Sequence, residues 1–183
     1  NKVTSMNNMF NSCFSLTTIP LLDTSKVTNM RYMFQYCYSL KAIPQLNTSN
    51  VTSMNNMFQN CSSLTTIPLL DTNKVTSMNS MFNSCYSLTT IPQLNTSNVI
   101  SMNSMFYSCN SLTIIPQLNT SKVTDMNYMF YNCYSLTTLS GLENLGQAYS
   151  TTQSANNSSY KLDLSKSTLL TEQSLINVLN NLY

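Results

Sequence analysis

The sequence predicts a solenoid of the α/β class, because one 24-residue unit is written six times within 183 residues. The six cysteines recur at intervals of 24, and all twelve methionines and all five prolines keep the same frame. A fixed period of about 20–50 residues is typical of solenoids. One such unit cannot bury its apolar face alone, so stacked neighbours share a continuous core.

The first half of each unit has the spacing of a short helix. In the third unit, Met54, Met57, Phe58 and Cys61 stand at i, i+3, i+4 and i+7, as on one helix face. Thr52 precedes them at a position where its hydroxyl would cap the first turn. We therefore expect one helix of about two turns in each coil.

The second half of the unit predicts a short strand. Residues 64–67, Leu-Thr-Thr-Ile, have strand propensity and are followed by Pro68, which lacks the N–H that a ladder needs. Leu70 adds an apolar anchor before the polar turn at 71–74. Equivalent strands of successive coils should pair in parallel at roughly 4.7–4.9 Å.

The repeat M-F-x-x-C-x-S-L-T-x-I-P resembles the repeat of BspA-like leucine-rich-repeat proteins, found on bacterial surfaces and in mycoplasma lipoproteins. The resemblance covers about residues 3–140. It implies a right-handed leucine-rich-repeat-like solenoid and a role in adhesion or host interaction. It implies no catalytic residues.

We expect the six-repeat solenoid to occupy residues 1–140 and an irregular terminal unit to occupy 141–183. The polar stretch 147–159 suggests a loop, and the alternation over about 160–165 predicts a strand. A capping helix is expected over about 172–182, capped by Thr171 and laid on the last coil. Its apolar stripe has the helical spacing and consists of Leu175, Val178, Leu179 and Leu182.

The chain begins inside a unit, with Asn1 and Lys2 in the place of a preceding turn. Solenoids need caps to shield the ends of the core. We therefore expect a fragment of a longer protein, located extracellularly or at the cell surface, with its export signal upstream. An uncapped N-terminal end also allows self-association.

Charge and hydropathy exclude two classes of partner. Charged residues make up 8% of the chain, against about 25% in typical domains. The net charge of +2 forms no basic stripe, so nucleic acid is not an expected partner. No apolar run approaches the roughly 20 residues of a membrane span, so no direct membrane insertion is expected.

The residue inventory predicts no enzyme, no catalytic residues and no cofactor. Histidine is absent, which removes the commonest general base. The six acidic residues are scattered, with no pair placed for glycoside hydrolysis. The repeats contain no glycine for a phosphate-binding loop.

The cysteines predict a ladder of buried free thiols. In-register thiols would lie near the strand spacing of roughly 4.7–4.9 Å, whereas a disulfide needs Cβ atoms about 3.5–4.5 Å apart. Disulfides are the alternative. One cysteine per coil without histidine forms no closed tetrahedral metal site, so no metal is expected.

The candidate binding residues come from columns that vary between copies. These columns follow the helical spacing outward, and tyrosine, asparagine and serine dominate them, as in antibody paratopes. An ordinary solvated surface is the alternative interpretation. Eight tyrosines and two basic residues are the candidate binding residues: Arg31, Tyr32, Tyr36, Tyr38, Lys41, Tyr86, Tyr107, Tyr128, Tyr131 and Tyr134.

Tyr38, Tyr86 and Tyr134 share one column and should lie two coils apart, roughly 10 Å by the strand spacing. Such spacing suits a sugar or an extended chain. The predicted function is a non-enzymatic binding module that recognises a protein or glycan on a host or neighbouring cell. The alternative is a structural spacer or fibre segment of a cell surface or phage particle.

Overall fold

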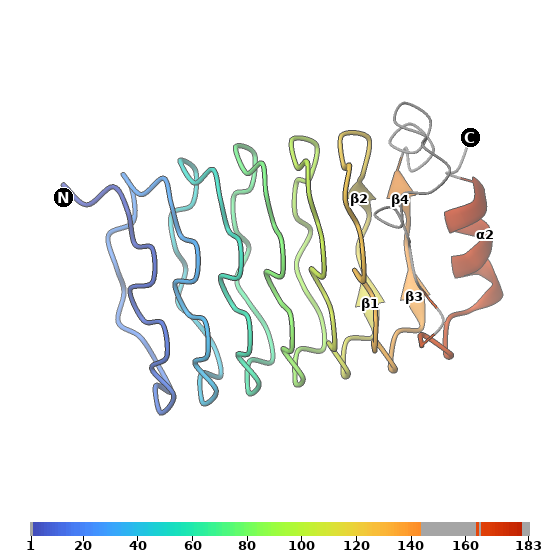
Figure 1. Cartoon of the computed structure of the whole chain (residues 1–183), viewed down its shortest axis with the longest axis horizontal. Coiled ribbons are helices and arrows are strands. Elements are labelled where there is room, and N and C mark those ends of the chain that lie inside the picture. The colour runs from blue at the N-terminus through green and yellow to red at the C-terminus, as the bar shows by residue number, and fades with distance from the viewer. Residues whose placement is uncertain (1, 144–163, 165, 181–183) are drawn as a thin grey trace.

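The computed structural model describes residues 2–143, 164 and 166–180, and shows six coils stacked along one long axis (Figure 1). We number the coils by their cysteines, from Cys13 in the first to Cys133 in the sixth. At the far end of the stack lies α2, Glu172–Asn180, the only helix in the part of the chain that is described.

Regular strands are confined to the fifth and sixth coils within the described residues. They are β1 (Ile114–Ile115), β2 (Leu118–Asn119), β3 (Thr138–Leu139) and β4 (Leu142–Glu143). β1 pairs in parallel with β3, and β2 pairs in parallel with β4. The sixth coil therefore continues the register of the fifth.

The prediction of one short helix per coil is wrong. In each coil, the segment that holds the two methionines, the phenylalanine and the cysteine is a succession of turns. Two of its residues have positive φ, such as Asn56 (56°) and Asn60 (61°) in the third coil. Helical residues need φ near −63°, so a helix cannot continue through these positions. The N–H of Met57 donates to the carbonyl of Met54 at 3.2 Å, closing a turn across three residues.

The N–H groups that alternate with these turn-closing ones donate to the next coil. The N–H of Asn56 donates to the carbonyl oxygen of Asn79 (2.8 Å), and that of Phe58 donates to Met81 (2.9 Å), both in the next coil. Hydrogen bonds between coils thus satisfy backbone N–H groups that a helix would satisfy within itself. Thr52 is likewise no helix cap, because its N–H and Oγ1 both donate to the carbonyl of Thr28.

The expected strand of every coil is also only partly present. The stretch 64–67 is not a strand, and the coil-to-coil bond there, from the Thr89 N–H to the Thr65 carbonyl, is 3.3 Å long. A more regular ladder of single parallel bridges runs just before the first methionine of each unit. Its members are Ser5, Asn29, Ser53, Ser77, Ser101 and Asp125.

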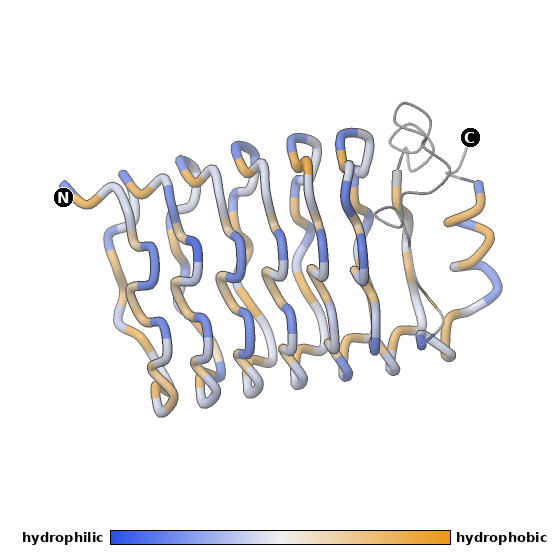
Figure 2. Tube along the Cα trace, in the orientation of Figure 1, coloured by the Kyte–Doolittle hydropathy of each residue, from blue (hydrophilic) through white to orange (hydrophobic). Residues whose placement is uncertain are grey.

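The core is built from columns of identical side chains. The phenylalanine rings of neighbouring coils stack with centroids 5.5–5.7 Å apart and planes within 8° of parallel; the members are Phe10, Phe34, Phe58, Phe82, Phe106 and Phe130. Methionine, valine, leucine and isoleucine columns are buried around them. Figure 2 shows the same alternation of hydrophobic and hydrophilic positions in successive coils.

All six cysteines are free thiols, and five of them are buried. Each buried Sγ donates to a phenylalanine carbonyl of the preceding coil, as from Cys85 to Phe58 at 3.0 Å. Burial raises the pKa of the Cys37 thiol to about 11 and that of Cys133 to about 12. It raises the pKa of Cys85 and Cys109 well above the ordinary range. The thiols are therefore neutral core groups.

A thiol reagent should distinguish the exposed cysteine from the buried ones. In the native chain of residues 1–183 we expect rapid labelling of Cys13 alone, because only the thiolate reacts and the other five thiols are buried. All six should react in denaturant without any reductant. Fewer than six under those conditions, measured by mass spectrometry, would indicate disulfides instead.

Helix α2 lies against β3. Thr171 caps it as expected, since its Oγ1 accepts the N–H of Ser174 at 3.2 Å. The predicted apolar stripe is wrong in part. Val178 is buried, but Leu175 and Leu179 are 44% and 57% exposed.

The contact between α2 and the last coil depends on a hydroxyl. Ser174 is buried, and its Oγ accepts the N–H of Leu139 (3.1 Å) and donates to the carbonyl of Thr137 (3.3 Å). The edge of the last coil presents backbone groups that an apolar side chain could not satisfy. Three expectations fall outside the described residues. They are the inward position of Leu182, the loop at 147–159 and, apart from Leu164, the strand over 160–165.

Candidate functional site

A groove of about 1480 Å³ crosses the first five coils on the side that carries the polar turns. Each of the first four coils contributes the five residues that follow its proline, and the fifth contributes Gln117 and Asn119. The four segments are 21–25, 45–49, 69–73 and 93–97. The same chemical surface is therefore repeated along the groove.

Short side-chain turns fix the polar edge of this groove. Oδ1 of Asn47 accepts both the N–H (3.1 Å) and the hydroxyl (2.7 Å) of Ser49. Asn95 and Ser97 repeat the arrangement two coils on, at 3.0 and 2.8 Å. Asparagine and aspartate favour such turns because their short side chains bond to the backbone two residues ahead.

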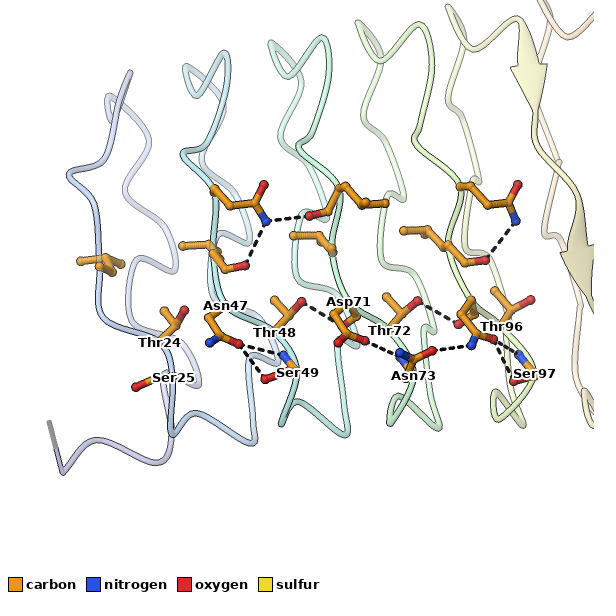
Figure 3. Close-up of a pocket in the computed structure, with 18 of the residues that line it drawn as sticks. Thr24, Ser25, Asn47, Thr48, Ser49, Asp71, Thr72, Asn73, Thr96 and Ser97 are labelled. Atoms are coloured by element: carbon orange, nitrogen blue, oxygen red, sulfur yellow. Dashed lines mark hydrogen bonds between the residues drawn. The ribbon is translucent and has the colours of Figure 1, made fainter.

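Buried threonines form a row beneath these turns. Oγ1 of Thr48 and Thr72 each donates to a carbonyl of the next coil at 2.8 Å, and that of Thr96 does so at 2.9 Å. Figure 3 shows this row and the side-chain turns at equivalent positions of successive coils. Because both rows are tied to the backbone, the groove is already formed without a ligand.

The groove alternates between two kinds of coil. The first and third read Leu-Leu-Asp at 21–23 and 69–71, whereas the second, fourth and fifth read Gln-Leu-Asn. Leu21 and Leu69 are 78% and 61% exposed. The alternation keeps two carboxylates from occupying adjacent coils, where like charges about 5 Å apart would repel.

The glutamines of the intervening coils bind the backbone beside them. Nε2 of Gln45 donates to the carbonyl oxygen of Leu69 at 2.7 Å, and Nε2 of Gln93 donates to that of Gln117 at 2.6 Å. Along one edge of the groove, apolar and amide side chains thus alternate over the first four coils, and the fifth coil adds a second amide beside that of the fourth.

None of the candidate residues predicted from the sequence lines this groove. Five of them belong to the second coil. The Arg31 guanidinium carbon lies 5.6 Å from the ring centroid of Tyr32, and Tyr36 meets Tyr38 edge-on at 6.2 Å. Tyr38 also stacks on Phe14 of the first coil at 5.4 Å. Lys41 is exposed.

A second tyrosine cluster lies in the fifth and sixth coils. Tyr107 and Tyr131 stack at 5.2 Å, and Tyr128 meets Tyr131 edge-on at 6.0 Å. The Tyr134 hydroxyl donates to Oδ1 of Asn132 at 2.9 Å. Tyr86 is exposed in the fourth coil, between the two clusters along the stack. The tyrosine-rich positions therefore form two groups separated along the solenoid.

The sequence reading missed the groove, although a signal for it was present. In the sequence, the turn at 71–74 indicates only a polar turn, and the acidic residues indicate only that no carboxylate pair is placed for glycoside hydrolysis. The sequence does show Leu-Leu-Asp in some units and Gln-Leu-Asn in others. It does not show that these residues line a concave surface, because that surface forms only when the coils stack.

The described residues contain no group of three or more side chains suited to hold a metal ion. Within the same part of the chain, no helix has the length and hydrophobicity to cross a membrane.

The model of a family described as Mycoplasma protein of unknown function, DUF285, matches residues 1–87 and 65–167. The chain belongs to this family. The resemblance to BspA-like leucine-rich repeats is confirmed by this match together with the leucine-rich-repeat fold of the Treponema pallidum structure described next. No curated protein matches the chain.

Several solved structures match this DUF285 chain, among them three bacterial proteins. A Treponema pallidum leucine-rich-repeat protein is 24% identical over 67% of the chain, with a TM-score of 0.50. A leucine-rich-repeat protein of Bacteroides ovatus is 17% identical over 74%, and a leucine-rich cell surface protein of Faecalibacterium prausnitzii is 27% identical over 70%, both with TM-scores of 0.44. The first of these shows a shared leucine-rich-repeat fold.

The chain spans 56% of the Treponema protein, 40% of the Bacteroides protein and 41% of the Faecalibacterium protein.

Proposed function

We propose that this chain is a non-enzymatic binding module that holds an extended ligand along its groove. The observation that carries the proposal is that equivalent positions of five successive coils line one groove. A ligand that lies along the stack would meet an equivalent backbone segment in each coil, with leucine and aspartate in some coils and glutamine and asparagine in the others. A compact ligand would use only a small part of this surface.

The fixed shape of the groove supports the proposal. Thr48, Thr72 and Thr96 and the asparagine turns are already hydrogen-bonded, so little ordering of the protein would accompany binding. The exposed Leu21 and Leu69 offer apolar contact, and the side-chain amides between them offer hydrogen bonds. Most binding sites combine an apolar lining with a few positioned polar groups in this way.

The resemblance to bacterial surface repeat proteins favours a place outside the cell. There the module would serve adhesion, by recognising a protein or glycan of a host or neighbouring cell. The groove and the tyrosine clusters are both suited to recognition, and neither holds a histidine.

The tyrosine clusters are the second candidate site. Stacked and edge-on rings, with Arg31 over Tyr32, form rigid aromatic surfaces at two places along the solenoid. Tyrosine supplies large contact areas at low conformational cost, as in antibody paratopes. A glycan or protein spanning several coils would contact these positions.

The two sites can be separated with substitutions that the repeat itself already contains. A groove variant would combine Leu21→Gln and Leu69→Gln with Asp23→Asn and Asp71→Asn, since neighbouring coils carry glutamine and asparagine there. A tyrosine variant would combine Tyr38→Ser, Tyr86→Ser and Tyr134→Ser, since Ser62 occupies the same column. Both should retain the wild-type circular dichroism spectrum.

Wild type and both variants would be screened against glycan, peptide and host-protein arrays. We expect the groove variant to lose about tenfold or more in affinity for the captured ligand, and the tyrosine variant to keep it. The opposite pattern would place the site on the tyrosines. No ligand for the wild type would favour the structural spacer.

A further inference from the structure

We propose that the second coil carries a site for an acidic sugar, built from Arg31, Tyr32, Tyr36 and Tyr38. The proposal rests on the role in recognition proposed above and names a ligand class for the second candidate site, but it does not depend on the groove. Three observations carry it: the backbone conformation of two tyrosines, the departure of Arg31 from its column, and the chemistry of the surface that these side chains form.

Two of these tyrosines occupy backbone positions that disfavour them. Among the described residues, twelve other than glycine have positive φ, two in each coil, and nine of the twelve are asparagine or serine. Asparagine tolerates this left-handed region because its short side chain bonds locally, whereas a bulky residue is strained there. Tyr32 (57°) and Tyr36 (62°) both lie in the second coil. The third coil has Asn56 and Asn60 at the same two positions.

Arg31 departs from a column that otherwise joins coils. Oδ1 of Asn55 accepts the N–H of Asn79 at 3.1 Å, and Oδ1 of Asn79 accepts that of Asn103 at 3.1 Å. A guanidinium has no acceptor, so Arg31 cannot offer this bond to the third coil. The other five residues of the column are all asparagine: Asn7, Asn55, Asn79, Asn103 and Asn127.

The second coil therefore lacks favourable features of the repeat at three positions. Residues held in strained conformations are concentrated at functional sites, where the surrounding structure maintains them. Tyr128 is the third tyrosine with positive φ, but it lies in the sixth coil, which contains no arginine. Only the second coil combines two strained tyrosines with the single arginine of the chain.

The four side chains form one surface. The Arg31 guanidinium lies against the ring of Tyr32, and Tyr36 meets Tyr38 edge-on. The two pairs are neighbours, as the equivalent positions of the first coil show. There, Asn11 donates to Oδ1 of Asn8 (2.8 Å) and accepts the hydroxyl of Ser12 (2.7 Å), and Asn8 and Ser12 are the counterparts of Tyr32 and Tyr36.

Arg31 favours an anionic ligand. Its side chain is exposed, and no acceptor among the described residues takes a hydrogen bond from the guanidinium. The unit 27–50 contains only two charged residues, Arg31 and Lys41, and both are basic. A guanidinium donates two parallel, charge-assisted hydrogen bonds to a carboxylate. A carboxylate on the ligand would therefore bind the edge of the Arg31 guanidinium while its face remains against Tyr32.

The size of the surface favours a sugar over a protein. Tyr38 is 43% exposed, and Tyr32 and Tyr36 are half-buried. An aromatic side chain covers about 150–250 Å², so the exposed parts of this surface amount to on the order of 300 Å². A stable protein interface needs about 800 Å² per partner. A sugar ring has C–H groups on its faces and hydroxyls at its rim, which match the tyrosine rings and their hydroxyls.

Isothermal titration calorimetry with acidic sugars tests the ligand class. The probes are sialyllactose and a hyaluronan tetrasaccharide, which carry their carboxylates on different sugars. The matched control for each is its methyl ester. We expect at least one acid to bind about tenfold or more tightly than its ester, because a charge-assisted hydrogen bond is lost in the ester. Equal binding of acid and ester for both probes, or no binding of either acid, would overturn the proposal.

A second-coil variant tests the residues. Arg31→Asn, Tyr32→Asn and Tyr36→Asn together give the second coil the residues that the third coil has at 55, 56 and 60. We expect the affinity for the acidic sugar to fall about tenfold or more, while the urea midpoint rises because the strain is removed. The matched control is Tyr128→Asn, which should raise the urea midpoint and change the affinity less than twofold.

The two readouts separate recognition from packing. A lower urea midpoint for the second-coil variant would show that these side chains stabilise the coil, and would overturn the proposal. Binding that persists in this variant would overturn it as well.

The groove variant separates this proposal from the groove. It should bind the acidic sugar within twofold of the wild type, because none of the four residues lines the groove. An acidic sugar that the groove variant loses and the second-coil variant keeps would overturn this inference and support the groove. Failure of both acidic sugars to bind, with another ligand lost by the groove variant, would also overturn this inference alone.

Discussion

Replacing Phe82 with alanine is expected to lower the free energy of unfolding by about 3–5 kcal/mol. Phe82 is fully buried in the fourth coil, and its ring stacks on both Phe58 and Phe106 with centroids 5.6 Å apart. Alanine would leave a cavity in the middle of the stack, because each coil is held only by its neighbours and the shared backbone ladder limits collapse.

Urea denaturation followed by circular dichroism measures this loss. Phe82→Leu should cost less, about 1–2 kcal/mol, because most of the buried volume is kept. Phe10→Ala in the first coil is the positional control: Phe10 is only half-buried and stacks on a single ring, that of Phe34. A loss at Phe82 no larger than that at Phe10 would contradict a core carried by the phenylalanine column.

Raising the pH above about 9 is expected to unfold the chain progressively. The unfolded thiols titrate near 9, whereas burial raises the pKa of Cys37 to about 11, that of Cys133 to about 12 and those of the other buried thiols further. In this range the folded state binds more protons than the unfolded state, so stability falls as pH rises. The stabilising contribution is complete below about pH 9 and is lost progressively as the pH rises above that value.

Urea midpoints between pH 7 and 11 measure this dependence. The control is the double variant Cys85→Ala and Cys109→Ala, which removes two of the five buried thiols. It should be less stable at pH 7 because of the cavities, but its stability should fall less steeply with pH. An unchanged slope would contradict the assignment of the alkaline loss to the buried thiols.

Much of the architecture follows from the sequence because the repeat is nearly perfect. The period of 24 dictates a stack, and the in-register cysteines dictate free thiols rather than bridges. The apolar spacing identified the inward columns correctly: Met54, Met57, Phe58 and Cys61 are all fully buried. The outward tyrosine columns follow from the same periodicity, and Tyr38, Tyr86 and Tyr134 are exposed.

The backbone path could not be deduced from that spacing. Side chains at i, i+3, i+4 and i+7 also point inward from a run of turns in which Asn56 and Asn60 have positive φ. Periodicity reports which side chains are buried, whereas the partners of the N–H groups depend on the neighbouring coil. Once that coil is in place, inter-coil bonds such as that from Phe58 to Met81 replace the internal bonds of a helix.

The groove and the contact of α2 were likewise decided only in three dimensions. Segments 24 residues apart form one concave surface because stacking aligns them, which a single unit does not reveal. Ser174 rather than Leu175 or Leu179 faces the last coil, because the backbone groups of that edge need a hydrogen-bonding partner. The sequence by itself determined the repeat and its buried columns, and tertiary stacking determined the hydrogen-bond partners and the shape of the surface.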